Sequence, residues 1–192
     1  FYMRNFIPTN AKLIPKDAAK VFGGIIFDVY QWQQKMFDGS TQVFEKLKRP
    51  DSVQVIAIKE GKIVVLEQEQ PDTGLFYSFP GGRHDEDGED ELQAAQRELL
   101  EETGMKFSNW KLISAVQPLV KIDWIVYTFI ATDFIDQTIQ NLDSGEKITV
   151  TLKTLDEIKE LSKDPKTRNL EKDLFGRVRS IQEFMNLPDC SK

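Results

Sequence analysis

The most informative part of the sequence is residues 79–105, which read FPGGRHDEDGEDELQAAQRELLEETGM. A Pro-Gly-Gly turn opens this stretch, an acidic loop follows, and the hydrophobic period then becomes that of a helix. Apolar residues recur at spacings of three and four, on one helical face: Leu92, Ala95 and Leu99. Gly104 stands where a left-handed residue ends a helix. The pattern predicts a helix over residues 89–103 that packs one face against a sheet.

Three glutamates of this helix share a second face. Glu98, Glu101 and Glu102 stand at positions i, i+3 and i+4, about one turn apart. Carboxylates this close repel one another, at a cost of roughly a few tenths of a kcal/mol for each pair. A hard divalent cation bound between these carboxylates replaces their repulsion with attraction. Mg²⁺ suits the three carboxylates because it prefers oxygen ligands and often completes its shell with substrate phosphates. Taken alone, the trio also fits an ordinary solvated acidic face.

The joint pattern resembles the Nudix box, the signature of the Nudix hydrolase superfamily. Its consensus is Gly, five residues, Glu, seven residues, Arg-Glu, an aliphatic residue, any residue, Glu-Glu, any residue, Gly and an aliphatic residue. Glu89, seven further residues and then RELLEETGM at residues 97–105 match the second half completely. Six residues rather than five separate Gly82 from Glu89, so the loop is one residue longer than the consensus.

The resemblance implies a hydrolase of nucleoside diphosphates linked to another group, with Mg²⁺ or Mn²⁺ as cofactor and water as nucleophile. The metal ligands that it implies are Glu98, Glu101 and Glu102, and Glu102 is also a candidate catalytic carboxylate. It makes Glu89 and Arg97 a pair that fixes the loop to the helix. It makes Gly82 and Gly104 positions of special backbone geometry. The fold it implies is an α/β/α sandwich around a mixed sheet.

The order of the predicted elements is that of an α+β protein. Extended segments are expected at residues 24–32, 41–47, 52–58, 62–66, 75–79, 124–132 and 147–152. A capping box at residues 154–157 begins a helix that runs to about Leu161, and residues 170–185 have the pattern of one final amphipathic helix. We divide the chain into an N-terminal β extension, residues 1–50, and a Nudix hydrolase domain with a C-terminal helix, residues 51–192.

The segment before the box resembles the ADP-ribose pyrophosphatase branch, in which an N-terminal β extension precedes the core and often pairs two subunits. The likeness lies in residues 21–30, 37–39, 44–49, 66–68 and 117–118. We therefore expect a homodimer joined through the extension, whose apolar run at residues 21–32 would otherwise leave a sheet edge open. The chain departs from the branch twice. It has Pro80-Gly81-Gly82 for Pro-Ala-Gly, and Glu69-Gln70 where the branch has an arginine that holds the substrate phosphate.

Several residues near the box have two interpretations. Arg83 can bind substrate phosphate beside Gly82, or pair with Asp85 or Asp87 within the loop. His84 is expected to be a loop residue rather than a base, and the basic run at residues 46–49 is expected to be a solvated strand end. Candidates for stacking on a base are Trp32, Phe44 and Trp124, although aromatic residues in strands are more often part of the core.

The resemblance to this branch also implies a glutamate on a loop after the box, just before a late strand, that orients the attacking water and accepts its proton. Asp143-Ser144-Gly145-Glu146 precedes an alternating run, so Glu146 is the candidate general base. Gly145 and Ser144 give this loop freedom to close over a substrate. The alternative is an ordinary acidic turn.

Composition excludes several other classes. The 192 residues include 25 basic and 31 acidic side chains, a net charge of −6, which disfavours nucleic-acid and anionic-membrane partners. One cysteine, Cys190, and one histidine exclude an intrachain disulfide and multi-histidine metal sites. No apolar stretch approaches the ~20 residues that span a bilayer, and no signal-peptide core is visible. We expect a soluble cytoplasmic protein with a small nucleotide substrate.

Three functions remain open at this point. The first is a Mg²⁺-dependent pyrophosphatase that cleaves ADP-ribose or another nucleotide sugar to a nucleoside monophosphate and a sugar phosphate. The second is the same chemistry on a nucleoside triphosphate or a dinucleotide. The third is a Nudix-fold module that binds a nucleotide without cleaving it, and the intact carboxylate trio argues against it.

Overall fold

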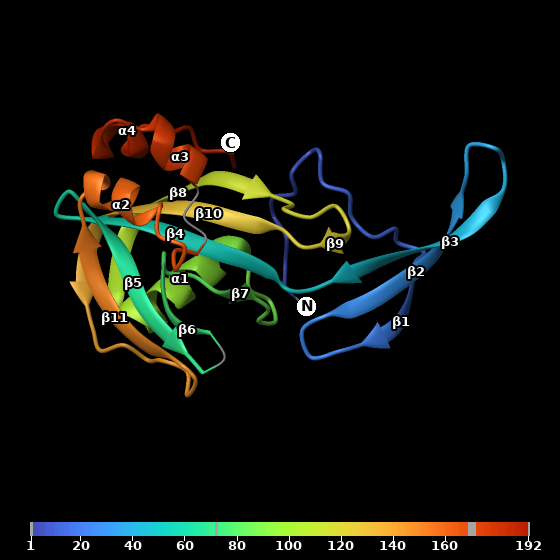
Figure 1. Ribbon diagram of the computed structural model, residues 1–192, viewed down its shortest axis with the longest axis horizontal. Coiled ribbons are helices and arrows are strands. Elements are labelled where there is room, and N and C mark those ends of the chain that lie inside the picture. Colours follow the sequence, from blue (N-terminus) through green and yellow to red (C-terminus); the bar gives the residue numbers. More distant parts are fainter. Residues whose placement is uncertain (1, 72, 169–171, 192) are drawn as a thin grey trace.

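A computed structural model describes residues 2–71, 73–168 and 172–191 (Figure 1). The strands are β1 Ala19–Gly23, β2 Asp28–Lys35, β3 Thr41–Lys48, β4 Asp51–Lys59, β5 Lys62–Gln70, β6 Gly74–Ser78, β7 Arg83–His84, β8 Met105–Val116, β9 Ile122–Asp123, β10 Val126–Gln137 and β11 Lys147–Lys153. The helices are α1 Glu91–Thr103, α2 Leu155–Leu161, α3 Lys172–Arg177 and α4 Ile181–Met185.

The main sheet is mixed and has the order β11-β5-β4-β10-β8, with β6 paired to β5 and β7 to β4. Strand β10 runs parallel to β4, whereas β5 is antiparallel to it. Because successive side chains of a strand point to opposite faces, the apolar run of β4 builds two cores. Val55 packs in the core that contains Leu99 of α1, and Ile56 packs in the core that contains Ile158 and Phe184. The predicted α/β/α sandwich is confirmed.

Helix α1 begins and ends where local capping requires. The side chain of Asp90 accepts a hydrogen bond from the Gln93 N–H, and the side-chain carbonyl of Gln93 accepts one from the Asp90 N–H. The helix therefore starts two residues later than the predicted Glu89. Gly104 has φ 69°, and a Cβ there would collide with the Thr138 backbone.

Among the described residues, no helix has both the length and the apolarity to cross a bilayer.

The N-terminal sheet has the order β1-β2-β3-β9 and extends away from the sandwich (Figure 1). The single strand predicted over residues 24–32 is wrong at its start, because the chain reverses between β1 and β2. There the Gly24 N–H donates to the Phe27 carbonyl at 2.9 Å. A Cβ on Gly24 would lie 2.6 Å from that carbonyl oxygen, so a side chain at this position would disrupt the reversal.

Residues near the N-terminus pack on the sandwich rather than on this sheet. The Arg4 guanidinium forms ion pairs with Asp51 at 2.6 Å and Asp123 at 2.8 Å. The Phe6 N–H donates to the Glu91 carboxylate at 2.8 Å, and the Tyr127 hydroxyl donates to the Phe6 carbonyl at 2.8 Å. Part of the predicted extension is thus attached directly to the main domain.

One strand was missed, and one further expectation is wrong. Strand β8 was not predicted, because its pairing with β10 shifts register twice and its apolar residues do not keep one alternation. The final amphipathic helix is two short helices, since the Ser180 hydroxyl accepts from the Glu183 N–H at 3.2 Å and starts α4 anew. Leu170, the first residue assigned to that helix, lies outside the described residues. The capping box at Thr154 and Glu157 is confirmed at the start of α2.

Candidate active site

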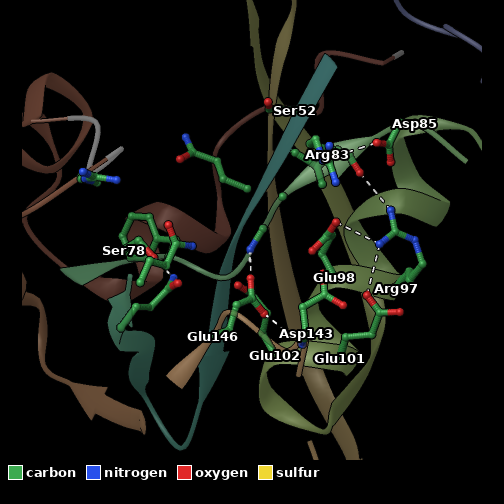
Figure 2. A pocket seen from close by; sticks show the side chains of 18 of the residues that line it. Ser52, Ser78, Arg83, Asp85, Arg97, Glu98, Glu101, Glu102, Asp143 and Glu146 are labelled. Carbon is green, nitrogen blue, oxygen red and sulfur yellow. Dashed lines mark hydrogen bonds and ion pairs between the residues drawn. The ribbon is translucent and has the colours of Figure 1, made fainter. Parts of the chain in front are cut away.

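A cleft of about 480 Å³ opens between α1, the Pro-Gly-Gly turn and the β5–β6 edge of the main sheet (Figure 2). Its acidic lining residues are Asp85, Glu86, Glu98, Glu101, Glu102, Asp143 and Glu146. Its basic lining residues are Arg49, Arg83, Arg97 and Arg168. The residues to which the sequence assigned metal, phosphate-binding or general-base chemistry, namely Gly82, Arg83, Glu98, Glu101, Glu102 and Glu146, all line this cleft.

The Pro-Gly-Gly turn is bonded directly to the helix. The Gly81 N–H donates to Glu102 Oε2 at 2.7 Å (Figure 2). Gly81 has φ 149°, and a Cβ there would collide with the Val53 backbone, so only glycine fits. A Cβ on Gly82 would lie 2.5 Å from the Glu98 carboxyl. The two glycines thus let the turn approach the carboxylates of α1 closely.

Arg97 joins the acidic loop to the helix, as the sequence predicted for it and Glu89. Its Nε donates to Glu89 at 2.9 Å, and its Nη1 donates to Glu98 at 2.9 Å and Glu101 at 3.1 Å. Burial alone would lower the pKa of Arg97, but hydrogen bonds and charges of Glu89 and Glu98 outweigh it and raise that pKa. Arg97 therefore remains charged and balances the nearby carboxylates.

The extra loop residue does not break this arrangement. Residues 83–84 form β7, which pairs with Ser52 and Asp51 at the start of β4. His84 is fully buried, and its Nε2 lies 2.8 Å from the Glu89 carbonyl oxygen. His84 is thus a packed residue that anchors the loop, which agrees with its assignment as something other than a base.

The carboxylates of the cleft repel one another in the absence of a cation. Burial, with smaller contributions from Glu101 and Glu146, raises the pKa of Glu98 to about 7 even though Arg97 opposes the shift. Burial also raises the pKa of Glu102 well above its ordinary value, and the charges of Glu98 and Glu146 add to this. The mutual influence of these groups indicates that they face a common space.

The donor set fits a hard divalent cation in its chemistry. All the acidic groups are oxygen donors, and Glu102, only 5% exposed, receives a backbone N–H but no arginine in the described part of the chain. The side chains are nevertheless not arranged as a closed cage. Within residues 2–71, 73–168 and 172–191, no three acidic, histidine or cysteine side chains already surround a metal position. Arg97 instead pairs with Glu98 and Glu101, and Glu102 accepts a hydrogen bond from the Gly81 N–H.

Glu146 reaches the cleft from the loop before β11. Its N–H donates to the Asp143 carbonyl at 3.0 Å, which closes a tight turn. Burial raises the pKa of Glu146, and the charges of Asp143 and Glu101 add to the shift. A partly buried carboxylate with a raised pKa, facing the α1 glutamates, is suited to exchange a proton with a substrate or water.

The remaining candidates divide between the cleft and the rest of the molecule. Arg83 pairs with Asp85 at 3.3 Å, as its second interpretation predicted. It also lines the cleft, and its binding of substrate phosphate stays a prediction. Trp32 and Phe44 lie in the N-terminal sheet, with ring centroids 6.0 Å apart, and are not part of the cleft lining. The Trp124 ring lies under the Arg49 guanidinium at 4.7 Å, and its indole N–H donates to Ser52.

Sequence reasoning missed Arg49 and Arg168. The basic run at residues 46–49 is not a solvated strand end, because Lys46 is buried, with its ammonium on the Lys12 carbonyl, and Arg49 borders the cleft. Arg168 comes from the segment after α2, about a hundred residues from the β5 position where the sequence has no basic residue. Nothing local in the sequence marks either residue, because only the fold brings them to the cleft.

Comparisons with known proteins identify the family of this chain. Residues 48–174 match the model of the NUDIX domain family, and because this is more than half of the chain, the chain belongs to the Nudix hydrolase family. It is similar to the ADP-ribose pyrophosphatase of Bacillus subtilis (strain 168), with 31% identity over 150 residues, 76% of this chain and 80% of that protein. It is also similar to the methanol dehydrogenase activator of Bacillus methanolicus, with 30% identity over 171 residues, 86% of this chain and 91% of that protein.

A solved structure described as an ADP compounds hydrolase has the same fold. It superposes with a TM-score of 0.68 at 19% identity and covers 88% of this chain and 95% of that chain. Together, the predicted family, its ADP-ribose pyrophosphatase-like branch and the hydrolase class are confirmed.

Proposed function

We propose that this chain hydrolyses the diphosphate of a nucleoside diphosphate derivative in a Mg²⁺-dependent reaction, with ADP-ribose as the first candidate substrate. The products would be AMP and a ribose phosphate. The observation that carries the proposal is the convergence of Glu98, Glu101, Glu102 and Glu146 on one cleft whose rim is the Gly81-Gly82 turn. The 31% identity to an ADP-ribose pyrophosphatase supports the choice of substrate.

In this reaction, Glu98, Glu101 and Glu102 would hold Mg²⁺ or Mn²⁺. Once bound, such a cation neutralises phosphate charge and lowers the pKa of water. Arg97 would release Glu98 and Glu101 to the cation and stay paired with Glu89, so the loop remains attached to α1. The backbone at Gly82 and the guanidinium of Arg83 would contact phosphate oxygens.

Glu146 would orient the attacking water and accept its proton on its carboxylate. The raised pKa of Glu146 brings it closer to neutral pH, which favours proton transfer in both directions. Glu102 is the alternative proton acceptor, because it is the most buried of the four carboxylates and its pKa is also raised.

We further propose a cytoplasmic homodimer that pairs through the N-terminal sheet. Several large apolar side chains project from this sheet and its turns: Val21, Phe22, Ile25, Ile26, Phe27, Phe37 and Val43. Ile25 is 99% exposed. A second copy that pairs with this sheet would remove such side chains from water. The division into residues 1–50 and 51–192 belongs to the same proposal.

A substrate panel with Mg²⁺ tests the reaction. ADP-ribose, other nucleotide sugars, nucleoside triphosphates and dinucleotides would be incubated with enzyme, and the products separated by anion-exchange chromatography. AMP and ribose phosphate from ADP-ribose support the proposal. Pyrophosphate from a triphosphate would favour the second function. Tight nucleotide binding without products in either Mg²⁺ or Mn²⁺ would favour the binding module.

A further inference from the structure

A short segment after α2, residues 166–168, lies along the edge of β6. Tyr77 in β6 donates its N–H to the Lys166 carbonyl at 3.0 Å, and its carbonyl accepts from the Arg168 N–H at 2.8 Å. Tyr77 and Thr167 form a parallel β-bridge. The Thr167 hydroxyl donates to the Leu161 carbonyl at 2.6 Å, which ties the segment to the end of α2. The backbone of Arg168 is therefore fixed by the sheet.

The side chain of Arg168 packs against an aromatic residue in the wall of the cleft. Its guanidinium carbon lies 4.4 Å from the centroid of the Phe76 ring. Phe76 is only 7% exposed and pairs with Gln68 of β5, and all three residues line the cleft. Stacking uses the face of a guanidinium and directs its N–H groups outward in the plane, where they match phosphate oxygens.

The acidic lining of the cleft requires positive charge nearby if an anionic diphosphate is to bind. The carboxylates of α1 and the Asp143–Glu146 turn would repel an anionic diphosphate. On the opposite β5–β6 wall, Gln68, Gln70, Phe76 and Ser78 carry no charge, and the Gln68 amide already donates to the Ser78 hydroxyl at 2.6 Å. Arg97 is bonded to three glutamates. Arg49, Arg83 and Arg97 also line the cleft but come from other elements, so among the described lining residues Arg168 is the cation on this wall.

We propose that Arg168 binds the diphosphate of the nucleotide substrate from the β5–β6 wall, opposite the carboxylates of α1. The inference rests on the function proposed above and adds to it a residue for substrate binding. If Arg168 contacts phosphate, removing its side chain should weaken the binding of phosphorylated ligands only. If Arg168 instead stacks on the base, its removal should weaken the binding of adenosine as well.

The test combines binding and turnover. Binding of ADP and of adenosine in Mg²⁺ is measured by calorimetry and ligand-observed NMR in the Glu146→Gln background, where turnover is slowed and the proposed Mg²⁺ ligands are intact. In that background, Arg168→Ala should weaken ADP binding by about 10- to 100-fold and leave adenosine within about threefold. In the otherwise native chain, Arg168→Ala should raise KM for ADP-ribose by a similar factor, with kcat much less changed. Arg168→Lys should recover part of the loss.

Lys166→Ala is the matched control, because it removes a positive charge from the same segment without touching the cleft lining. Unchanged ADP affinity in Arg168→Ala, an equal loss for adenosine, or an equal loss in Lys166→Ala would overturn the inference. The two proposals fail separately. If the native chain hydrolyses no nucleotide but ADP binding depends on Arg168, only the proposed function is wrong. If ADP-ribose is hydrolysed with the same KM in Arg168→Ala, only the role of Arg168 is wrong.

Discussion

The backbone N–H of Gly81 donates a hydrogen bond to the buried carboxylate of Glu102 at 2.7 Å. This single contact joins the turn after β6 to the last turn of α1. It sets the distance between a backbone suited to phosphates and a carboxylate suited to a metal. Because Gly81 has no room for a side chain, the relationship depends on glycine at that position.

Replacing Glu102 tests the metal site. Glu102→Gln keeps the shape of the side chain and an oxygen that can accept from Gly81, but removes the charge. We expect hydrolysis to be abolished, while metal-free thermal stability stays equal or rises, because like-charge crowding is relieved. Activity assays and thermal unfolding in EDTA measure the two effects. A folded Glu102→Gln protein with near-normal turnover would refute the assignment of Glu102.

The raised pKa of Glu98 predicts a pH-dependent stability of the metal-free protein. That pKa is about 7 in the folded chain against 4.5 for the free group, so the fold prefers the protonated form. The resulting stabilisation is fully present below about pH 4.5 and is lost as the pH rises through about 7. In EDTA, Tm should therefore fall over this range, and it should fall less steeply in Glu98→Gln. Saturating Mg²⁺ should remove most of the difference, and parallel Tm profiles in EDTA would contradict the prediction.

Glu146 is tested by its effect on turnover. If Glu146 accepts the proton of the attacking water, Glu146→Gln should lower kcat by roughly 10²–10⁴-fold with little change in Mg²⁺ affinity. Steady-state kinetics and Mg²⁺ titration separate the two quantities. Asp143→Asn is the matched control in the same turn and should have a smaller effect on kcat. A drop of less than about tenfold in Glu146→Gln would transfer the role to Glu102.

Gly82 offers a test of the close approach between loop and helix. In Gly82→Ala the new Cβ would lie 2.5 Å from the Glu98 carboxyl and must push this side chain aside. We expect Mg²⁺ affinity to fall by about tenfold or more, because a displaced ligand costs binding, while the fold is retained. Gly176→Ala, which meets open space, is the control and should bind Mg²⁺ normally. Equal Mg²⁺ affinity in both variants would show that Glu98 does not bind the metal.

The molar mass of the protein in solution tests the proposed homodimer. Light scattering at micromolar concentration should give about 44 kDa, twice the chain mass of 22.1 kDa. Ile25→Asp, at a fully exposed position of the β1–β2 turn, should shift the protein to the monomer, because it places charge on the proposed interface. Ile139→Asp is the control, since Ile139 is 92% exposed but lies outside the N-terminal sheet. A single 22 kDa species of the native chain would count against pairing.

The family and the core of the site could be predicted from the sequence because they depend on short-range spacing. The i, i+3 and i+4 positions of Glu98, Glu101 and Glu102 put these side chains on one face of any helix, whatever surrounds it. The capping residues of α1 and α2 act on backbone groups within a few residues. The glycine at position 104 ends α1 for the same local reason.

Strands and helices whose first and last residues depend on pairing with distant segments were predicted less well. Strand β8 owes its shape to a register with β10 that shifts twice, and the apolar pattern of residues 105–116 does not reveal it. The two C-terminal helices share one amphipathic pattern, and only the cap at Ser180 divides them. The reversal at Gly24 is visible only once β1 and β2 are seen to pair.

The sequence alone determined the Nudix box and the carboxylate trio, because helical periodicity and the spacing of glycines act over a few residues. The sandwich was predicted through the family that the box resembles. Only the tertiary structure decided that Arg97 pairs with Glu98 and Glu101, and that Glu146 faces them across the cleft. It also brought Arg168 to the β5–β6 wall through backbone hydrogen bonds with Tyr77, about ninety residues away. Contacts of that range follow from how the sheet is paired and from what packs on its edge, which no local pattern of residues records.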